Sequence, residues 1–479
     1  MAESGPRVRA LVLAAGAASR FGGGKLAASI DGRPVLQHVL DALADAGFED
    51  PIVVVPPEPD LPAMDWRRAE RITNPDPARG LASSLRLGWG RAMASESTPE
   101  AVEAVLIVLG DQPLIRPDVL RSLAAMPLDQ ERPIVAARYT GTGARNPVRV
   151  EASAADLIAD AAGDRGLGPV LERHADLVRW LDVDGDNPDV DTAMDLARVA
   201  ELSWADRVRR NREQVDRLRE TPDGKDFYAT VSSIFRDDPD RSGDPVLDAL
   251  RAHARAGDTW LDIGAGAGRY ALPLARTVRR VIAIDPSTSM LGALREGMTE
   301  HRIENIEVLQ GRWPEVVEEG STLAGELPAN VSLIAHVGYD IEAIGPFLDA
   351  MEAAARRECV AVLMERSPAS IAEPFWPPIH GERRVALPAL PAFVDLLRAR
   401  GREPRVDIVD SSRRRMAGRD EVEAFVRRQT WVAPGTEKDR TMQKLIDGWL
   451  VQNEDGTVDL SIAEPLTVGL VSWEPRHRT

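Results

Sequence analysis

A glycine-rich loop directly after a short apolar strand most constrains what this chain can fold into. The segment LVLAAGAASRFGGGK, residues 11–25, begins inside a predicted buried strand over Arg9–Leu13 and continues in small residues. Small residues allow the backbone to approach a ligand closely, so that N–H groups surround phosphate oxygens. Two cations at the far end, Arg20 and Lys25, would neutralise a triphosphate. A flexible glycine turn between a strand and a helix is the alternative interpretation.

This loop is not a P-loop, because Ser19 replaces the first glycine of G-x-x-x-x-G-K-[ST] and Leu26 replaces its Ser or Thr. The loop instead resembles L-A-[AG]-G-x-S-x-R-[MF]-G-x-x-K, the signature of nucleotidyltransferases that attach a nucleotide to the molybdenum cofactor. Ala18 stands where that family usually has serine, which removes one possible phosphate hydrogen bond. The matching residues are Leu13, Ala14, Ala15, Gly16, Arg20, Phe21, Gly22 and Lys25.

Strands and helices alternate through the rest of the first half. Helical spacing of apolar residues predicts a helix over Pro34–Ala46, and Pro51–Val55 is predicted as a second strand. This alternation indicates an α/β domain with a parallel sheet, whose ligand lies at the carboxyl ends of the strands.

The segment NPDPARGLASSLRLG, residues 74–88, predicts a loop that runs into a helix starting near Leu81. It matches the family segment N-P-x-x-x-x-G-[ML]-x-x-S, which lies against the nucleotide. The resemblance therefore implies nucleotide contacts for Asn74, Gly80 and Ser84, in addition to Leu13, Ala14, Ala15, Gly16 and Lys25 of the first loop. A capped surface helix is the alternative.

A lone carboxylate follows the apolar strand of VLIVLGDQPLI, residues 105–115. Asp111 at the tip of this strand would point into the ligand crevice, and magnesium binds carboxylates together with substrate phosphates. A turn aspartate before proline is the alternative. G-D-Q-P is also the metal-binding motif of the cytidylyl branch of the family that the first loop resembles.

A second acidic segment precedes a predicted helix over Ala193–Ala200. The run from Asp182 to Leu196 is not an EF-hand, because Asn187 and Ala193 replace its glycine and its terminal glutamate. Its end matches the family motif D-[IV]-D-T, which implies that Asp191, rather than Asp189, joins Asp111 at the metal. A solvated acidic loop is the alternative. The segments 145–148 and 163–168 resemble two further family motifs, the first near the acceptor site.

The resemblance covers residues 9 to about 200 and implies a reaction. A nucleotidyl group would pass from a nucleoside triphosphate to the phosphate of molybdopterin, with release of pyrophosphate and with Mg²⁺. Arg20, Lys25 and Asp111 would be the catalytic residues. Ala15 favours CTP, since the guanylyl branch usually has glycine there. Related transferases use other small phosphates, which stay open as acceptors. A molybdoenzyme or its chaperone is a further possible partner.

A second glycine-rich loop opens the other half. The segment TWLDIGAGAGRYALPLA, residues 259–275, places a strand before glycines at G-x-G-x-G spacing, and a second strand ends at Asp285. A dinucleotide fingerprint would need glycine at Arg269. A carboxylate at Asp285 can accept both ribose hydroxyls, so a nucleoside site is favoured over a plain α/β turn.

This half resembles the class I S-adenosylmethionine-dependent methyltransferases, most clearly over residues 244–366. The resemblance implies that the glycines pass along the methionine part of the cofactor and that Asp285 holds the ribose. The family often has an acidic residue beside the adenine after the third strand, where this chain has Gly311-Arg312-Trp313. Arg312 or Trp313 is therefore expected to contact the adenine. The full cofactor set is Asp262, Gly264, Gly266, Gly268, Asp285, Arg312 and Trp313.

The fourth strand of this half, within VSLIAHVGYDI at residues 331–341, would end at the transferring methyl group. His336, Tyr339 and Asp340 are therefore expected on the methyl-acceptor side, with His336 as a base only if the acceptor carries a proton. A structural role for His336 is the alternative. The acceptor cannot be named, because this fold takes small molecules and proteins alike. A half that binds ligand without catalysis also stays open.

Length and composition bound the remaining possibilities. A chain of 479 residues is too long for one core, and we expect α/β domains of three-layer Rossmann-like type at 1–200 and 201–479, with 201–245 as linker or cap. A net charge of −17 disfavours nucleic acid and anionic membranes. The single Cys359 excludes an intramolecular disulfide and a cysteine zinc cluster. The first apolar run, Ala10–Ala15, is too short for a signal peptide, so we expect a cytoplasmic protein.

Overall fold

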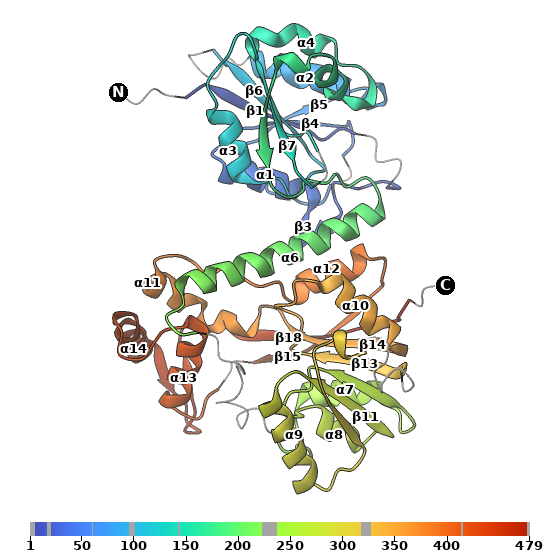
Figure 1. Cartoon of the computed structure of the whole chain (residues 1–479), viewed down its shortest axis with the longest axis vertical. Helices are drawn as coiled ribbons and strands as arrows, with labels where there is room; N and C mark the ends of the chain where they lie inside the picture. The colour runs from blue at the N-terminus through green and yellow to red at the C-terminus, as the bar shows by residue number, and fades with distance from the viewer. Residues whose placement is uncertain are drawn as a thin grey trace. The chain divides into compact units, whose positions relative to one another are not determined.

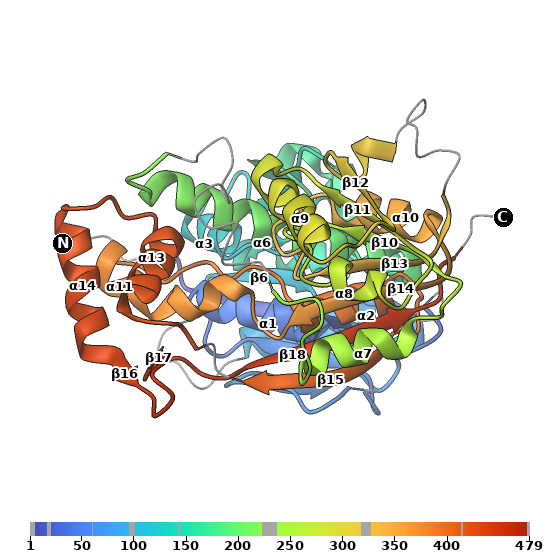
Figure 2. The same ribbon diagram turned by 90° about the horizontal axis from the view of Figure 1, so that it is seen from below.

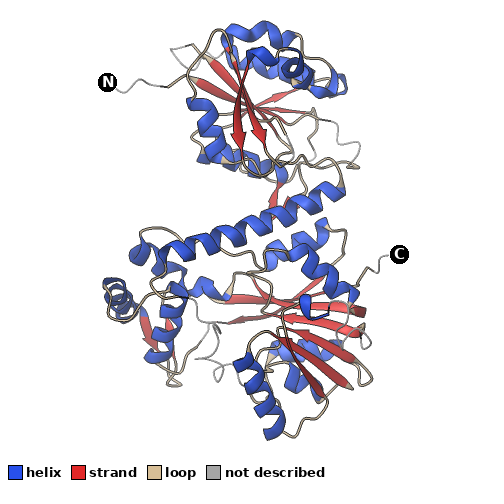
Figure 3. Ribbon diagram, in the orientation of Figure 1, coloured by secondary structure: helices blue, strands red, loops and turns tan. Residues whose placement is uncertain are grey.

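The structure is a computed structural model that describes residues 5–16, 21–59, 61–94, 101–141, 144–222, 237–317, 327–412 and 415–476. The chain divides into two units, Met1–Ala200 and Glu201–Thr479 (Figure 1). Each unit contains a seven-stranded sheet with helices packed on it (Figure 3). The expected fold class of two tandem α/β domains is confirmed.

The sheet of the first unit has the strand order β5-β4-β1-β6-β8-β7-β9. It is mixed rather than purely parallel, because β8 runs antiparallel to both β6 and β7. The connection 140–147 is shorter than the dozen or so residues that a parallel crossover needs, so β7 and β8 must form a hairpin. The strands are β1 (Val8–Leu13), β4 (Ile52–Val55), β5 (Glu70–Thr73), β6 (Ala104–Leu109), β7 (Ile134–Tyr139), β8 (Val148–Glu151) and β9 (Val178–Val183).

Alternate residues of β1 face opposite sides of this sheet. Leu11 and Leu13 pack with α2 (Leu81–Met93), α4 (Ala155–Ala159) and α5 (Gly168–Arg173). Ala10 and Val12 pack with α1 (Val35–Asp45) and α3 (Pro117–Ala125). The period-two alternation of a strand thus gives two apolar cores and three layers. A small hairpin of β2 (Ser29–Ile30) and β3 (Arg33–Pro34) precedes α1.

The sheet of the second unit has the order β12-β11-β10-β13-β14-β18-β15, with β18 antiparallel to both of its neighbours. Figure 2 shows β15 and β18 side by side in this sheet. The strands are β10 (Thr259–Ile263), β11 (Arg280–Asp285), β12 (Ile306–Gln310), β13 (Ala329–Ala335), β14 (Ala355–Met364), β15 (Arg405–Ser412) and β18 (Leu466–Trp473).

Helices cover both faces of the second sheet. One core joins the sheet to α7 (Pro245–His253), α8 (Ala271–Ala275) and α9 (Thr288–Glu300). On the other face, Phe393 of α12 (Leu390–Ala399) meets Trp473 of β18 with ring centroids 5.8 Å apart. Cys359 of β14 is buried, and its thiol lies 3.9 Å from the Met351 carbonyl of α10 (Ile344–Ala353).

Two segments, residues 368–380 between β14 and α12 and residues 416–460 between β15 and β18, together form a helical insertion with an apolar core of its own. Trp449 packs edge-on against Phe375 in this core, with ring centroids 4.8 Å apart. The insertion contains η8 (Pro368–Phe375), α11 (Trp376–His380), α13 (Arg419–Thr430), α14 (Glu437–Trp449) and a hairpin of β16 (Leu450–Gln452) and β17 (Val458–Leu460). It follows the carboxyl end of β14 directly, which is the ligand-binding edge of such a sheet.

Two helices expected near the boundary are one helix. The predictions were a helix over residues 193–200 and an amphipathic helix over 203–220, whereas α6 runs without a break over Ala193–Leu218. No residue between 200 and 203 is a helix breaker, so nothing in the local sequence ends the first prediction. Within the described residues, no helix is both long and apolar enough to cross a membrane.

Candidate functional sites

Lys25 joins the two carboxylates that the sequence predicts as metal ligands. Its Nζ lies 2.6 Å from Oδ2 of Asp111 and 3.0 Å from Oδ1 of Asp191, although these residues are far apart in the chain. The Lys25 side chain is buried. Burial alone would lower its pKa, but the charges and hydrogen bonds of Asp111 and Asp191 outweigh burial and raise the pKa above its ordinary value.

The G-D-Q-P and D-V-D-T segments are joined by hydrogen bonds that bring their carboxylates together. Val190 N–H donates to the Asp111 carbonyl at 2.9 Å, and Gln112 Nε2 donates to Oδ1 of Asp189 at 2.7 Å. Asn187 Nδ2 donates to Oε1 of Gln112 at 3.1 Å. Asp189 is exposed, but desolvation by the neighbouring protein atoms, followed by repulsion from Asp111, raises the pKa of its carboxyl to about 6.

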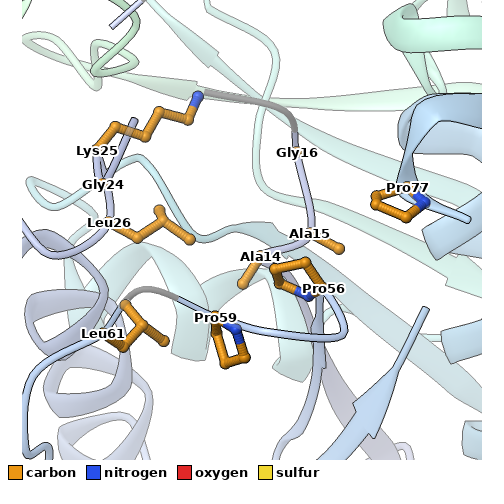
Figure 4. Close-up of a pocket in the computed structure, with 10 residues that line it drawn as sticks. All are labelled: Ala14, Ala15, Gly16, Gly24, Lys25, Leu26, Pro56, Pro59, Leu61 and Pro77. Atoms are coloured by element: carbon orange, nitrogen blue, oxygen red, sulfur yellow. The ribbon is translucent and has the colours of Figure 1, made fainter. Parts of the chain in front are cut away.

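A cavity of about 240 Å³ opens beside this carboxylate pair. Ala14, Ala15 and Gly16 line one side, Lys25 and Leu26 another, and Pro77 lies opposite (Figure 4). A Cβ added to Gly16 would meet no described atom within 4 Å, so its backbone faces open space. Arg20 of the same loop lies outside the described residues, as do residues 17–19. Leu13 is buried in β1 beneath the loop.

Asn74, Gly80 and Ser84 make contacts within and beside the segment that contains Pro77, and of this segment it is Pro77 that lines the cavity. Asn74 Nδ2 donates to the hydroxyls of Ser83 and Ser84, each at 2.9 Å, and Asn74 and Ser84 are buried. Gly80 has φ +85°, and a Cβ there would lie 2.6 Å from the Gly163 carbonyl carbon. Only glycine therefore allows the start of α2 to approach the turn at Gly163–Arg165.

The first site has the donor chemistry of a divalent cation site. Two carboxylates, Asp111 after β6 and Asp191 just before α6, already share one cationic group, which shows that both reach a common point. Hard carboxylate oxygens are the ligands that magnesium prefers, and it usually binds them together with substrate phosphates. Asp111 and Asp191 are the residues that would hold the ion.

In the second unit, the glycine loop adopts a conformation that glycine favours. Gly264, Gly266 and Gly268 have φ values of +77°, +56° and +85°. A Cβ at Gly264 would lie 2.5 Å from Val337 Cγ2, whereas at Gly266 it would meet no described atom within 4 Å. The loop therefore packs closely on one side and leaves an open cradle at Gly266, which fits the close approach of a nucleoside cofactor.

Asp285 and Asp262 lie beneath this cradle. Asp285 accepts hydrogen bonds from Gly266 N–H at 2.9 Å and from Ser287 N–H at 2.8 Å. Burial, followed by repulsion from Asp285, raises the pKa of Asp262 to about 7. Of the two residues predicted beside adenine, Arg312 is exposed, but Trp313 is buried and its indole N–H points to the Phe347 carbonyl at 3.3 Å. This placement gives Trp313 a core contact.

The residues expected on the methyl-acceptor side differ in exposure. Tyr339 is buried, its hydroxyl accepts from Met364 N–H at 2.7 Å, and burial raises its pKa. Asp340 is exposed. His336 has φ +58°, and its buried Nδ1 has no hydrogen-bond partner among the described residues. Burial, followed by repulsion from Arg269, lowers the pKa of His336 to about 4.

Comparison with known proteins identifies both units. Residues 10–178 match the MobA-like NTP transferase domain, and residues 261–324 match a methyltransferase domain. The phosphoenolpyruvate guanylyltransferase of Sphaerobacter thermophilus is 33% identical over 168 residues, which are 35% of this chain and 77% of that protein. The chain belongs to the MobA-like NTP transferases. It carries a methyltransferase domain in addition, so the expected enzyme classes are confirmed.

Other relatives match this MobA-like NTP transferase over shorter stretches. The bifunctional protein GlmU of Heliobacterium modesticaldum is 36% identical over 118 residues, and the chain spans about a quarter of the length of such GlmU relatives. The crystal structure of Rv0371c from Mycobacterium tuberculosis H37Rv is 27% identical and covers 41% of this chain and 98% of its own, with a TM-score of 0.34. The structure of the YcgJ protein of Bacillus subtilis is 14% identical in sequence. It covers 48% of this chain and 98% of its own chain, with a TM-score of 0.34.

Sequence reasoning missed several polar residues of this MobA-like NTP transferase. Gln112 and Asn187 link the two acidic segments by hydrogen bonds. Their positions within or beside the two acidic motifs could have indicated this role. In the second unit, the guanidinium carbons of Arg241 and Arg269 lie 5.8 and 5.7 Å from the centroid of the Tyr270 ring. The position of Arg241 depends on the fold, so its sequence offered no signal.

Proposed function

We propose that the first unit transfers a nucleotidyl group from a nucleoside triphosphate to a phosphorylated small molecule and releases pyrophosphate. The observation that carries this proposal is the Lys25–Asp111–Asp191 cluster beside the cavity of the first glycine loop. The membership in the MobA-like NTP transferases supports the same reaction class.

In this proposal the chain itself supplies binding and charge. Backbone groups of Ala14, Ala15 and Gly16 approach the phosphates, and Lys25 with Arg20 compensates the negative charge that grows on the leaving pyrophosphate. A phosphate acceptor is already ionised, so no strong base is required. A divalent cation on Asp111 and Asp191 would add Lewis-acid charge stabilisation when bound.

For the substrates, we propose CTP and molybdopterin first. Ala15 and the G-D-Q-P quartet support CTP, through the resemblance to the cytidylyl branch. The alternative is GTP with another phosphorylated acceptor, and it is favoured by the name of the relative from Sphaerobacter thermophilus, a phosphoenolpyruvate guanylyltransferase. Sugar phosphates are a further acceptor class.

We also propose that the second unit binds S-adenosylmethionine and transfers its methyl group to an acceptor of unknown identity. Gly264, Gly266 and Gly268 would follow the methionine part, Asp285 would hold the ribose, and Arg312 would lie at the adenine end. The open backbone at Gly266 and the fixed Asp285 carboxylate support this assignment. Positioning supplies much of the rate of an in-line methyl transfer. A unit that only binds the cofactor is the alternative.

The test uses the purified full chain with Mg²⁺ and α-labelled CTP or GTP in parallel reactions. Molybdopterin, phosphoenolpyruvate and a hexose 1-phosphate serve as separate acceptors. Label transfer from CTP to molybdopterin is the expected result. Transfer from GTP to phosphoenolpyruvate would keep the reaction class and replace both substrates. No transfer in any combination, beside an active control enzyme, would contradict the proposal.

A further inference from the structure

Lys25 lies where a metal ion would have to bind. Its ammonium contacts Asp111 and Asp191 at 2.6 and 3.0 Å, the same two carboxylates that would hold the divalent cation. The Lys25 side chain is buried, so water screens its charge poorly. An ammonium and a divalent cation at this position would compete, because their charges repel at close range and both are attracted to the same two carboxylates.

We propose that Lys25 is an internal counter-ion that keeps free divalent metal out of this site until a nucleotide arrives, and that the nucleotide's phosphates then draw its ammonium away from the carboxylates. This inference rests on the proposed nucleotidyl transfer and adds a regulation of that site. Metal and nucleotide would consequently bind cooperatively, and the metal-loaded protein without nucleotide would be sparsely populated.

The structure provides a place for the displaced ammonium. Lys25 lines the same cavity as Ala14, Ala15 and Gly16, where the phosphates would lie (Figure 4). The lysine side chain is flexible and carries a point charge that can turn from one anion to another. The move exchanges two carboxylates for phosphate oxygens, so Lys25 keeps anionic partners in both states.

The test measures Mn²⁺ binding to the full-length protein without nucleotide, by electron paramagnetic resonance of the free ion. Lys25→Met removes the ammonium and keeps the length of the side chain. Because the ion no longer competes with two charge-assisted hydrogen bonds, we expect Mn²⁺ to bind roughly tenfold more tightly or better. With CTP or GTP present, the same variant should lose the cooperative gain in Mn²⁺ affinity that the unaltered protein shows.

Lys444→Met is the matched control, because it removes the same charge from an exposed position in α14 of the other unit. Its Mn²⁺ affinity should equal that of the unaltered protein. The double variant Lys25→Met with Asp111→Asn should lose the tighter binding, which places the ion at this site. Thermal unfolding of each variant checks that it is folded.

Unchanged, weaker or undetectable Mn²⁺ binding by folded Lys25→Met would overturn the inference, because Lys25 would not compete with the ion. That result is separate from failure of the proposed function, which the label-transfer assay reports independently. Tighter binding that survives the Asp111→Asn change would also overturn it, since the ion would then lie elsewhere.

Discussion

At the scale of single residues, His336 combines a strained backbone with an unsatisfied buried nitrogen. A non-glycine residue at φ +58° is uncommon, and a buried Nδ1 without a described partner costs free energy in the folded state. Such features persist where the surrounding structure enforces them, and they concentrate at functional sites. The ring centroids of His336 and Tyr270 lie 6.5 Å apart, which places both beside the glycine loop.

The low pKa of His336 predicts a pH dependence of stability. The pKa is about 4 in the folded chain and near 6.5 when the side chain is free, so the unfolded state binds the proton first as pH falls. The contribution of neutral His336 to the free energy of unfolding is therefore complete above about pH 7. It is lost as the pH falls from about 6.5 to about 4.

His336→Asn should reduce this loss, and asparagine tolerates the left-handed backbone. The measurement is hydrogen exchange of β13 peptides, corrected for intrinsic rates, at pH 5 and pH 7.5. Protection in the unaltered protein should fall more at pH 5 than protection in the variant. The same fall in both proteins would contradict the assignment of this titration to His336.

The sequence was sufficient to predict that the two carboxylates lie together, but not that Lys25 bridges them. Asp111 lies directly after β6, at the edge where parallel sheets bind ligands, and Asp191 lies in the D-V-D-T motif just before α6, so the two motifs together predicted their convergence. The bridge through Lys25 could not, because it depends on the side-chain conformation of a residue 86 positions away from Asp111. Trp313 was predicted beside the adenine because it follows a strand end. Its side chain is buried and its indole N–H contacts the Phe347 carbonyl, and the sequence does not reveal this packing.

At the scale of elements, the start of α2 depends on a glycine. Gly80 at φ +85° lies so close to Gly163 that any side chain would collide with backbone atoms. Gly163 and Asp164 are far from Gly80 in the chain, so the contact follows from packing of α2 against the Gly163–Arg165 turn. The two family-like segments at 74–84 and 163–168 thus pack against each other at the start of α2.

Gly80→Ala should destabilise the protein by on the order of 2 kcal/mol, because it adds both backbone strain and a clash. Gly90→Ala is the control on the same helix, where a Cβ meets no described atom within 4 Å. That change should stabilise the helix by about 0.5 kcal/mol or more. Chemical denaturation of both variants gives the comparison, and equal effects of the two changes would contradict this account of Gly80.

Elements were predicted better than their connections. The apolar runs before both glycine loops became β1 and β10, and the helices α1 and α2 lie close to the predicted ranges. The reversed β8 was not anticipated, because strand direction depends on the length of the 140–147 connection, and period-two patterns look alike in either direction. The continuous α6 was missed because sparse apolar residues obscured its periodicity.

At the scale of the whole molecule, each unit is proposed to carry out one reaction. Each site is built from residues of its own unit, 1–200 or 201–479. The carboxylates of the first site belong to the first unit and the glycine loop of the second site belongs to the second unit, so we expect a substitution in one site to act on that site alone.

Asp285→Asn should therefore weaken S-adenosylmethionine binding and leave nucleotidyl transfer intact. Loss of a charged acceptor of ribose hydroxyls corresponds to a rise in Kd of roughly tenfold or more. Isothermal titration with S-adenosylmethionine gives the Kd, and transfer of the α-label serves as the second readout. Parallel loss of both activities in a folded variant would contradict independent sites.

The most direct test of the central claim is transfer of the α-label by the unaltered protein and by Asp111→Asn, with the exposed Asp184→Asn as the matched control. We expect Asp111→Asn to lower the rate of transfer by about 100-fold or more, because the carboxylate pair can no longer hold the cation that compensates phosphate charge. Asp184→Asn should retain transfer, and S-adenosylmethionine binding should be unchanged in both variants. Full transfer activity in Asp111→Asn would contradict the claim that this carboxylate pair carries the reaction.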